Sequence, residues 1–501
     1  MRQKNPNRTW NLISFLVLLL AAGSVFMLMR QIYVLKMLPE ETFKLICGSA
    51  VLVIFLLSLL LFTRKPKQGK KARHGKAIIG YLFSALLIAG CLFGIKAVGQ
   101  VQHTLDSITN TTKTTVVLEI YVRADDPAQT LQDMAGYTVG LPQEVSEADL
   151  APIMEDLEEA LKSQLTTVTC AGPVAQIDAL LSGEVDAVIL DNAYLSVLEG
   201  MEGYSDYAGK IRCLHEKVFE KEVPQVILPQ EQEEERSGFL MYVSGRDSWY
   251  GVLSNGRSDV NILVAVNPET HQVLLLNTPR DYYVVNPASG KGAKDKLTHC
   301  SIPGVENSMS ALALLYGYSP DYYARINFTG FETLVDAIGG VTIYSEKSFS
   351  ALGTYINKGE NHLNGQQALN FARERKNLWG GDNDRGKNQM KLVEGILNQL
   401  TAENLLNNYS QILQSLEGMF ATSMPSEEIS ELVQMQIAQM PDWEFFSFAV
   451  TGENGTDHCW AAGGYAYVMY PHENMVAKAS ELLGKVLTGE KLTQEDLVVN
   501  P

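Results

Sequence analysis

Residues 260–281 read VNILVAVNPETHQVLLLNTPRD, and this stretch sets the fold of the C-terminal part of the chain. VNILVAV and QVLLLN are apolar runs typical of buried strands, and the Asn267-Pro268-Glu269-Thr270 sequence between them is typical of a turn. If the turn closes an antiparallel hairpin, the numbers of opposed residues sum to about 537. At the mouth of this hairpin, Arg257 is then expected near Arg280, and Asp259 near Thr278 and Asp281.

Two aspartates near this mouth are candidate metal ligands. Asp259 lies at the mouth itself, and Asp247 follows an earlier apolar strand. Magnesium prefers oxygen ligands and phosphate partners, so paired carboxylates beside arginines suit a Mg²⁺ ion that bridges to phosphate groups. A salt-bridge network at the edge of the sheet is the alternative interpretation.

Residues 371–389, FARERKNLWGGDNDRGKNQ, bring many charged side chains together. Guanidinium groups this close repel one another unless an anion or carboxylates lie between them, and guanidinium forks match phosphate oxygens in pairs. A phosphate or pyrophosphate site is one interpretation, and a solvated loop balanced by its own carboxylates is the other. Arg385 and Gln389 are four residues apart at the start of a helical pattern and therefore share one face. The other charged residues considered are Arg373, Arg375, Glu374, Asp382 and Asp384.

The segments around these residues predict an α/β domain over 238–490. Helices are expected at 307–315 and 331–338. Asn364, followed three residues later by a glutamine, predicts an N-cap for a short helix that leads into the arginine segment. An amphipathic helix is expected over 388–400 because its apolar residues recur at helical spacing.

The part of the chain before this domain alternates strand-like and helix-like segments over 113–222, which predicts a small α/β domain with a parallel sheet. Residues 179–194, ALLSGEVDAVILDNAY, resemble one lobe of the periplasmic solute-binding proteins. A structural or partner-binding module is the alternative to a sensor. The acidic stretch 223–237 predicts a linker to the C-terminal domain.

The N-terminal region predicts three membrane-spanning helices, at about 10–29, 43–62 and 77–97. Residues 1–110 hold 14 Lys and Arg and 3 Asp and Glu, which gives a net charge of +11. Because the whole chain has a net charge of −17, the remaining residues carry −28. Seven Lys and Arg lie between Arg64 and Lys76. The positive-inside rule therefore places the N-terminus and this loop in the cytoplasm and the acidic remainder outside the cell membrane.

Four of the six cysteines fall in the extracytoplasmic part, where disulfides are permitted. The simplest expectation pairs cysteines within each domain. These pairs are Cys170 with Cys213 and Cys300 with Cys459. The cysteine and histidine spacing indicates no zinc site.

Together the C-terminal motifs resemble the LytR-CpsA-Psr family of cell-wall enzymes. The motifs are GRDS (245–248), GRSDVNILVAVNP (256–268), VLLLNTPRDYYV (273–284), RINFTGFETLVDAIGGVTI (325–343) and LNGQQALNFARERKNLWGGDNDRGKNQ (363–389). The resemblance implies an α/β/α sandwich around a central mixed sheet. It also implies a phosphotransferase that moves a teichoic acid, capsule or related glycopolymer from undecaprenyl pyrophosphate to peptidoglycan through a phosphodiester bond. A membrane location follows, and nucleic acid is not an expected partner.

The resemblance assigns roles to individual residues. Asp247 and Asp259 would be associated with Mg²⁺, and Asp382 would act in catalysis with Arg280 and Arg375. The residues implied to bind pyrophosphate are Arg257, Arg280, Lys296, Arg373, Arg375, Arg385 and Gln389. Two departures stand out: Asn277-Thr278 replaces a frequent Ser-Ile pair, and Asn388 replaces a frequent arginine, which weakens one expected phosphate contact.

Two other functions compete with transfer. The same residues could serve a hydrolase that cleaves a lipid pyrophosphate. The 113–222 domain could instead make the chain a non-catalytic envelope sensor or regulator.

Overall fold

A computed structural model describes residues 6–62, 75–109, 113–143, 145–162, 165–199, 201, 203–204, 206–222, 236–246, 252 and 254–499. The chain divides into two compact units. The first comprises Met1–Thr109, Leu400–Gln414 and Met424–Pro441. The second comprises Asn110–Gln399, Ser415–Ser423 and Asp442–Pro501.

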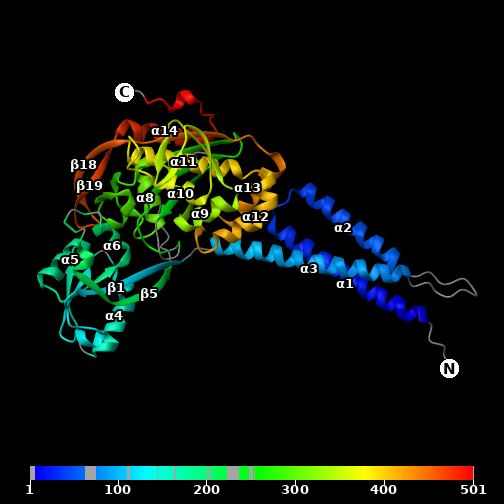
Figure 1. Cartoon of the computed structure of the whole chain (residues 1–501), viewed down its shortest axis with the longest axis horizontal. Coiled ribbons are helices and arrows are strands. Elements are labelled where there is room, and N and C mark those ends of the chain that lie inside the picture. The colour runs from blue at the N-terminus through cyan, green and yellow to red at the C-terminus, as the bar shows by residue number, and fades with distance from the viewer. Residues whose placement is uncertain are drawn as a thin grey trace, which may run out of the picture. The chain divides into compact units, whose positions relative to one another are not determined.

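The first unit contains three long apolar helices (Figure 1), α1 (Pro6–Leu35), α2 (Glu40–Leu61) and α3 (Gly75–Thr109). Each is long and apolar enough to cross a membrane. Small residues let them pack closely, since a Cβ on Gly80 would lie 3.0 Å from the Leu61 side chain. Helix α13 (Ser426–Gln439) and most of α12 (Ala402–Leu416) belong to the same unit.

The second unit begins with a five-stranded sheet, cyan and green in Figure 1, whose strand order is β3-β2-β4-β1-β5. The elements are β1 (Lys113–Arg123), β2 (Thr138–Pro142), α4 (Glu147–Leu161), β3 (Thr166–Cys170), α5 (Gly172–Ser182), β4 (Ala187–Asp191), α6 (Asn192–Glu199) and β5 (Ile211–Glu222). The expected parallel sheet is correct for β3, β2 and β4 and wrong for β1, which runs antiparallel to both neighbours. β5 pairs with β1 over its whole length and forms one edge of the sheet.

A six-stranded mixed sheet forms the core of the second unit, in the order β16-β11-β6-β7-β8-β17. Its strands are β6 (Phe239–Arg246), β7 (Val260–Asn267), β8 (Gln272–Asn277), β11 (Tyr322–Asn327), β16 (Phe420–Thr422) and β17 (Glu444–Ala449). The pairs β11–β6 and β8–β17 are parallel, and the other three are antiparallel.

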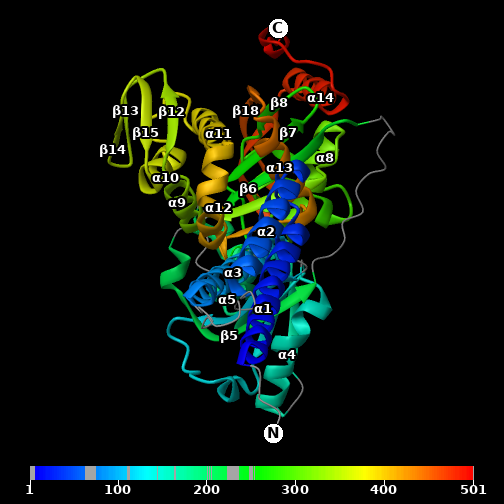
Figure 2. The same ribbon diagram turned by 90° about the vertical axis from the view of Figure 1, so that its right-hand side faces the viewer.

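Helices cover both faces of this sheet, as Figure 2 shows. Leu263 and Ala265 of β7 face the cluster that includes side chains of α8 (Val305–Tyr316) and α14 (Glu473–Thr488). The alternate residues of β7 face α11 (Asp382–Gln399), because side chains point to opposite sides along a strand. The expected α/β/α sandwich around a mixed sheet is therefore confirmed.

Shorter elements complete this unit. They are β9 (Tyr283–Val285), β10 (Lys294–Lys296), α7 (Leu297–Cys300), α9 (Phe328–Ala337), β12 (Val341–Ser345), β13 (Phe349–Ala351), β14 (Thr354–Ile356), β15 (Gly359–Leu363), α10 (Gly365–Arg373), β18 (Gly452–Cys459) and β19 (Gly464–Pro471). Short 3-10 helices lie at Leu131–Met134, Tyr207–Gly209, Pro287–Ser289 and Gln494–Leu497.

The β7–β8 hairpin forms as expected, but its register differs by two. Asn267 pairs with Gln272, and Ile262 pairs with Asn277, so opposed residue numbers sum to 539. The loop contains four residues rather than two, because the Asn267 side chain accepts hydrogen bonds from the N–H groups of Glu269 and Thr270. His271 then turns the chain with a φ of 58°. The predicted register is therefore wrong, and Asp259 takes the place opposite Arg280, while Arg257 still lines one cavity with Arg280.

The expected cap of α10 is present. Asn364 accepts from the Gln367 N–H, and the Gln367 side chain accepts from the Asn364 N–H. Helix α11 begins at Asp382, six residues earlier than expected. Its first turn is acidic, and Asp384 accepts from the Gly380 N–H, which suits the positive end of the helix dipole.

The expected disulfides are not formed. All six cysteines are described, and none of them forms a disulfide. Cys213 is exposed, whereas Cys170, Cys300 and Cys459 are buried. These last three therefore serve as small apolar core residues.

Candidate active site

Two adjoining cavities of about 300 and 510 Å³ hold most of the expected site residues. We call the smaller one the arginine cavity; its polar lining includes Asp259, Arg280, Arg373, Glu374, Arg375, Lys376, Arg385 and Gln389. We call the larger one the His299 cavity; its polar lining includes Arg257, Arg280, Asp281, Lys296, Thr298, His299, Arg375, Asp382 and Tyr467. Arg280 and Arg375 belong to both.

Three separate segments supply the guanidinium groups. Arg257 precedes β7 and Arg280 follows β8, so both lie at the same edge of the central sheet. Arg373 ends α10, and Arg385 lies in the first turns of α11. The turn between these helices returns the chain, and this brings Arg375 to the same two cavities.

Ion pairs hold this cluster together only in part. Arg280 Nη1 lies 2.7 Å from Asp259 Oδ1, and Arg385 Nη2 lies 2.8 Å from Asp382 Oδ1. The Nε–H groups of Arg280 and Arg385 are buried and have no hydrogen-bond partner among the described residues. The guanidinium plane of Arg373 lies against the Phe328 ring, with 4.8 Å from Cζ to the ring centroid. Arg280 Nε also lies 3.6 Å from Asp281 Oδ2, so this guanidinium bridges two carboxylates.

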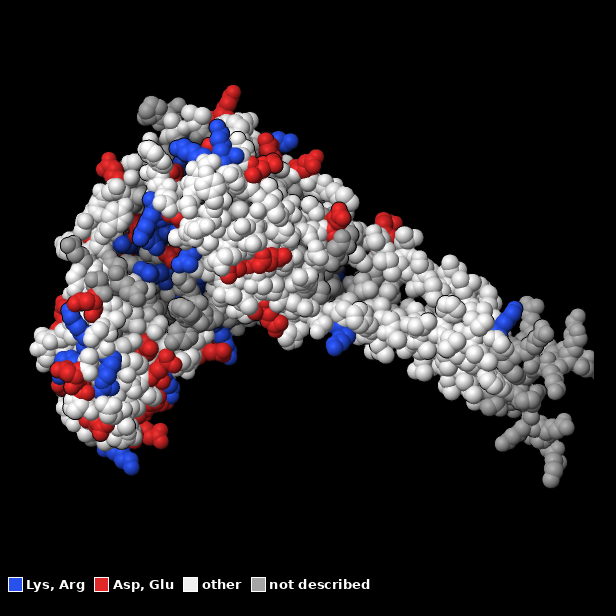
Figure 3. Space-filling view, in the orientation of Figure 1, with Lys and Arg blue, Asp and Glu red and all other residues white. Residues whose placement is uncertain are grey.

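Positive charge dominates both cavities. Seven Lys and Arg side chains line them, against the four carboxylates of Asp259, Asp281, Glu374 and Asp382. Figure 3 shows Lys and Arg side chains gathered around a hollow on this face of the molecule. A pyrophosphate, which presents several oxygens and negative charges, matches such a lining.

The two site aspartates titrate differently. Burial favours the neutral acid at Asp259, but the nearby Arg280 and Arg257 charges outweigh it and hold its pKa below the ordinary value. Burial raises the pKa of Asp382 despite the charges of Arg385 and Arg280. Asp259 is thus held ionised, while Asp382 takes up a proton more readily.

Asp259 fits a magnesium ligand, because it offers an ionised carboxylate beside the arginine cavity. Its Oδ1 is shared with Arg280. The second expected ligand, Asp247, lies outside the described residues.

Sequence reasoning missed a histidine in this site. His299 lines the larger cavity, and its Nδ1 lies 2.6 Å from Asp295 Oδ1. Asp295 also accepts from the N–H groups of Lys296 and Ala461. Asp295 lies in β10 and His299 in the short helix α7 that follows it, so the only available signal was a spacing of four residues. Val197 and Met201, which lie within the segment 113–222, also line this cavity and had no sequence signal.

Asp295, His299 and Cys459 bring potential metal-ligand atoms within 4.8 Å of one another. The aspartate oxygens, however, are already occupied by hydrogen bonds from His299 and two backbone N–H groups. Burial raises the pKa of the Cys459 thiol to about 12, so it is neutral. This cluster is a hydrogen-bonded core group.

Two buried arginines support the site from outside the cavities. Arg246 and Arg325 are 4% and 3% exposed, and both donate to the Ser254 carbonyl. Arg246 also donates to the Asn255 carbonyl at 2.6 Å. Gly256 leaves room for the Arg246 guanidinium, which a Cβ would strike. The loop that carries Arg257 is therefore fixed by buried charge.

Comparison with known proteins identifies the family of this chain. Residues 210–480 match the LytR_cpsA_psr family. The chain belongs to this family. One relative is the polyisoprenyl-teichoic acid–peptidoglycan teichoic acid transferase TagU of Bacillus mycoides (strain KBAB4). It is 28% identical to this chain over 214 residues, which cover 42% of this chain and 68% of the relative. TagU of Enterococcus faecalis is 32% identical over 183 residues, 36% of this chain and 60% of the relative. Among solved structures, B. subtilis TagV has 23% identity and a TM-score of 0.43, and the match covers 51% of this chain and 98% of that chain.

The two departures from the frequent LytR-CpsA-Psr residues have different surroundings. The Thr278 hydroxyl lies 2.8 Å from the Tyr316 hydroxyl, inside the core. Asn388 does not line the arginine cavity or the His299 cavity. It lines a third cavity together with Trp379 and Asp384. The expectation of a weakened phosphate contact at Asn388 is therefore not supported by its position.

Proposed function

We propose that this chain transfers an anionic or secondary cell-wall glycopolymer from undecaprenyl pyrophosphate to peptidoglycan by forming a phosphodiester. The observation that carries the proposal is the convergence of five arginines, from three segments of a LytR-CpsA-Psr chain, on two adjoining cavities. The relatives' names, teichoic acid–peptidoglycan transferases, support the class of reaction.

A glycan hydroxyl attacks the phosphorus that carries the polymer. The new P–O bond forms as the bond to the bridging pyrophosphate oxygen breaks, and undecaprenyl phosphate leaves. Arg280 and Arg375 belong to both cavities, so they are placed to bind the oxygens of both phosphates and to stabilise the charge that builds on the leaving group. A bound Mg²⁺, with Asp259 among its ligands, would neutralise further phosphate charge.

The proton of the attacking hydroxyl goes to a base in the His299 cavity. Asp382 is the leading group, because a carboxyl whose pKa is raised by burial is a stronger base than an exposed one. His299, held through Nδ1 by Asp295, is the second group within the same cavity.

The arginine cavity also has apolar residues, which support the proposal that the lipid part of the donor binds there. Val260, Phe328 and Leu352 line that cavity together with the guanidinium groups. We propose that the first isoprenyl units contact them, while the polymer and the acceptor approach through the His299 cavity.

Substitution of the two shared arginines tests the function. A charge-assisted hydrogen bond to phosphate contributes roughly 1.5–3 kcal/mol, so Arg280→Ala or Arg375→Ala should slow transfer about ten- to a hundredfold. Arg→Lys should rescue poorly, because an ammonium does not reproduce a two-pronged contact. The measurement is transfer of a sugar from a lipid pyrophosphate to a glycan acceptor by the full chain.

The control variant is Lys358→Ala, at an exposed lysine between β14 and β15, and it should transfer at the wild-type rate. Transfer by both arginine variants at the wild-type rate would show that the site is misassigned. A large fall in their melting temperature would assign the arginines to a structural ion-pair network. Product analysis with and without acceptor separates a transferase from a hydrolase, which would release the same products in both cases.

A further inference from the structure

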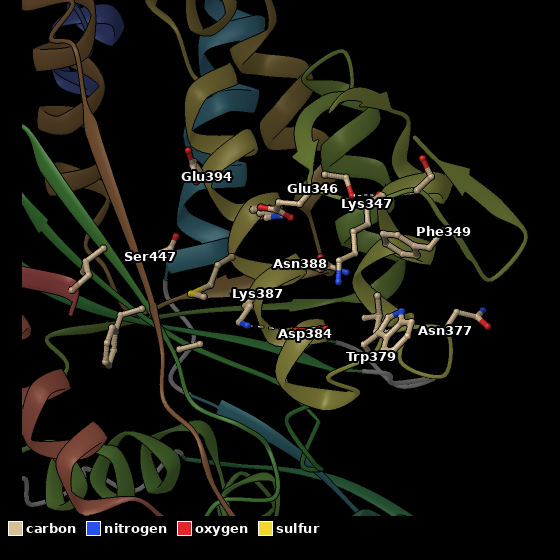
Figure 4. Close-up of a pocket in the computed structure, with 18 residues that line it drawn as sticks. Glu346, Lys347, Phe349, Asn377, Trp379, Asp384, Lys387, Asn388, Glu394 and Ser447 are labelled. Carbon is tan, nitrogen blue, oxygen red and sulfur yellow. Dashed lines mark hydrogen bonds and ion pairs between the residues drawn. The ribbon is translucent and has the colours of Figure 1, made fainter. Parts of the chain in front are cut away.

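A third cavity, of about 650 Å³, is lined in part by the turn between α10 and α11 (Figure 4). We call it the Trp379 cavity. It is formed by residues 345–349, the turn at 377–379, one side of α11 and the end of β17. The mechanism above does not use it.

The cavity has an aromatic wall. Trp379 is 94% exposed, which is unusual for so large an apolar ring. The Lys347 ammonium lies 5.8 Å from the centroid of this ring, and both side chains are drawn side by side in Figure 4. Phe448 and Met390 are buried and line the same cavity. An exposed indole face suits a flat ligand with both apolar and polar groups.

The cavity also contains a buried donor that lacks a partner. Asn388 is 7% exposed, and its Nδ2 has no hydrogen-bond partner among the described residues. An unpaired buried donor costs stability unless a ligand or a water molecule accepts from it. The Asn388 amide is therefore available to donate to an oxygen acceptor, such as a hydroxyl or an N-acetyl carbonyl.

The charges of this cavity balance, unlike those of the arginine cavity. Three carboxylates and three ammonium groups line it: Glu346, Asp384, Glu394, Lys347, Lys387 and Lys391. Lys391 lies 2.7 Å from Glu346, and Lys387 lies 3.4 Å from Asp384. Such a lining favours a neutral polar ligand over a polyanionic one.

The Trp379 cavity and the two phosphate-binding cavities share one short segment. Asn377 lines the Trp379 cavity two residues after Arg375, and Asp384 does so immediately before Arg385. A glycan bound along Trp379 would therefore be held by the same turn that carries the reaction-site arginines.

We propose that the Trp379 cavity binds an uncharged, N-acetylated glycan segment of the acceptor strand, with a sugar ring stacked on Trp379 and an oxygen accepting from Asn388. This proposal rests on the proposed function, because it assigns the acceptor of that reaction to a subsite of its own. A lining whose charges cancel offers the anionic polymer no net electrostatic attraction.

Direct binding tests the subsite. The probe is a soluble tetramer of β-1,4-linked N-acetylglucosamine, titrated calorimetrically into the full chain in detergent. Trp379→Ala and Asn388→Ala should each weaken binding at least tenfold, whereas Trp379→Phe should retain most of it because the ring is kept. The matched control is Tyr355→Ala, which removes another exposed aromatic ring, 66% exposed, that does not line the cavity.

Failure of the subsite and failure of the proposed function give different results. Arg280→Ala should still bind the tetramer with wild-type affinity while losing transfer. Trp379→Ala should raise the KM for the glycan acceptor and leave the KM for the lipid donor unchanged. Wild-type binding by both Trp379→Ala and Asn388→Ala, or no binding by the wild-type chain, would overturn the subsite. Tighter binding of a soluble polyglycerol phosphate than of the tetramer, lost in Trp379→Ala, would overturn the choice of a neutral ligand.

Discussion

At the scale of single residues, Asp382 and His299 compete for one role in the same cavity. A base must be unprotonated to act, and burial raises the pKa of Asp382. Transfer should therefore fall as the pH decreases through that raised pKa, and the fall should begin at a higher pH than for an exposed aspartate. The Asp382→Asn variant should transfer slowly, and its rate should no longer fall as the pH decreases. The His299→Gln variant should keep this fall in rate at low pH. Transfer rates measured between pH 4 and 8 check this prediction. If only His299→Gln loses the fall in rate at low pH, His299 rather than Asp382 is the base.

The buried arginines make a prediction about stability rather than chemistry. Removing Arg325 takes away one of the two guanidinium donors of the Ser254 carbonyl, and it removes the positive charge that acts on the partly buried Glu306. Breaking such a buried charged group costs about 3–5 kcal/mol. Arg325→Ala should therefore lower the midpoint of thermal unfolding by several degrees, and Arg325→Lys should not restore it. An unchanged melting temperature would show that this charge is not needed to hold the loop before Arg257.

At the scale of elements, the cap of α10 connects local sequence to the site. Asn364→Ala removes the hydrogen bond to the Gln367 N–H, which should cost roughly 0.5–2 kcal/mol. Because α10 ends at Arg373, fraying should also raise the KM for the lipid donor. The exposed Gln366→Ala on the same helix serves as the control, and equal effects of the two variants would contradict a capping role.

Most elements around the site could be predicted from the sequence, because they follow local rules. The Asn364 cap, the glycine-ended helix α9 and the β7–β8 hairpin all depend on neighbouring residues. The register of the hairpin could not be predicted, since it depends on Asn267 accepting two backbone hydrogen bonds and on His271 adopting a left-handed conformation. That shift of two residues is what places Asp259, rather than Arg257, beside Arg280.

The candidate site could also be predicted from the sequence only in part. The arginines were identifiable from charge and spacing within short segments. His299 was not identified, because its role depends on contacts with Asp295 and on a cavity built from several elements. Likewise, no local pattern indicates that Val197 and Met201, from the 113–222 domain, line a cavity with Arg257.

At the scale of the whole molecule, the proposed reaction requires the second unit to lie outside the cytoplasm. Helix α3 contains 35 residues, whereas about 20 residues span a bilayer. Its second half contains Lys96, His103 and Asp106, so this end should project from the membrane. Seven Lys and Arg between Arg64 and Lys76 should retain the loop before α3 in the cytoplasm.

Reporter fusions test this arrangement. A fusion after Thr63 should report the cytoplasm, and a fusion after Asn110, beyond the end of α3, should report the outside. Replacing the basic residues between Arg64 and Lys76 with glutamine should reduce the activity of the outer reporter, because it removes the charge that orients α2 and α3. The matched control replaces Lys96 with glutamine and should change neither reporter. A cytoplasmic signal after Asn110 in the wild-type chain would contradict the proposed function, because the arginine cavity would then have no access to peptidoglycan.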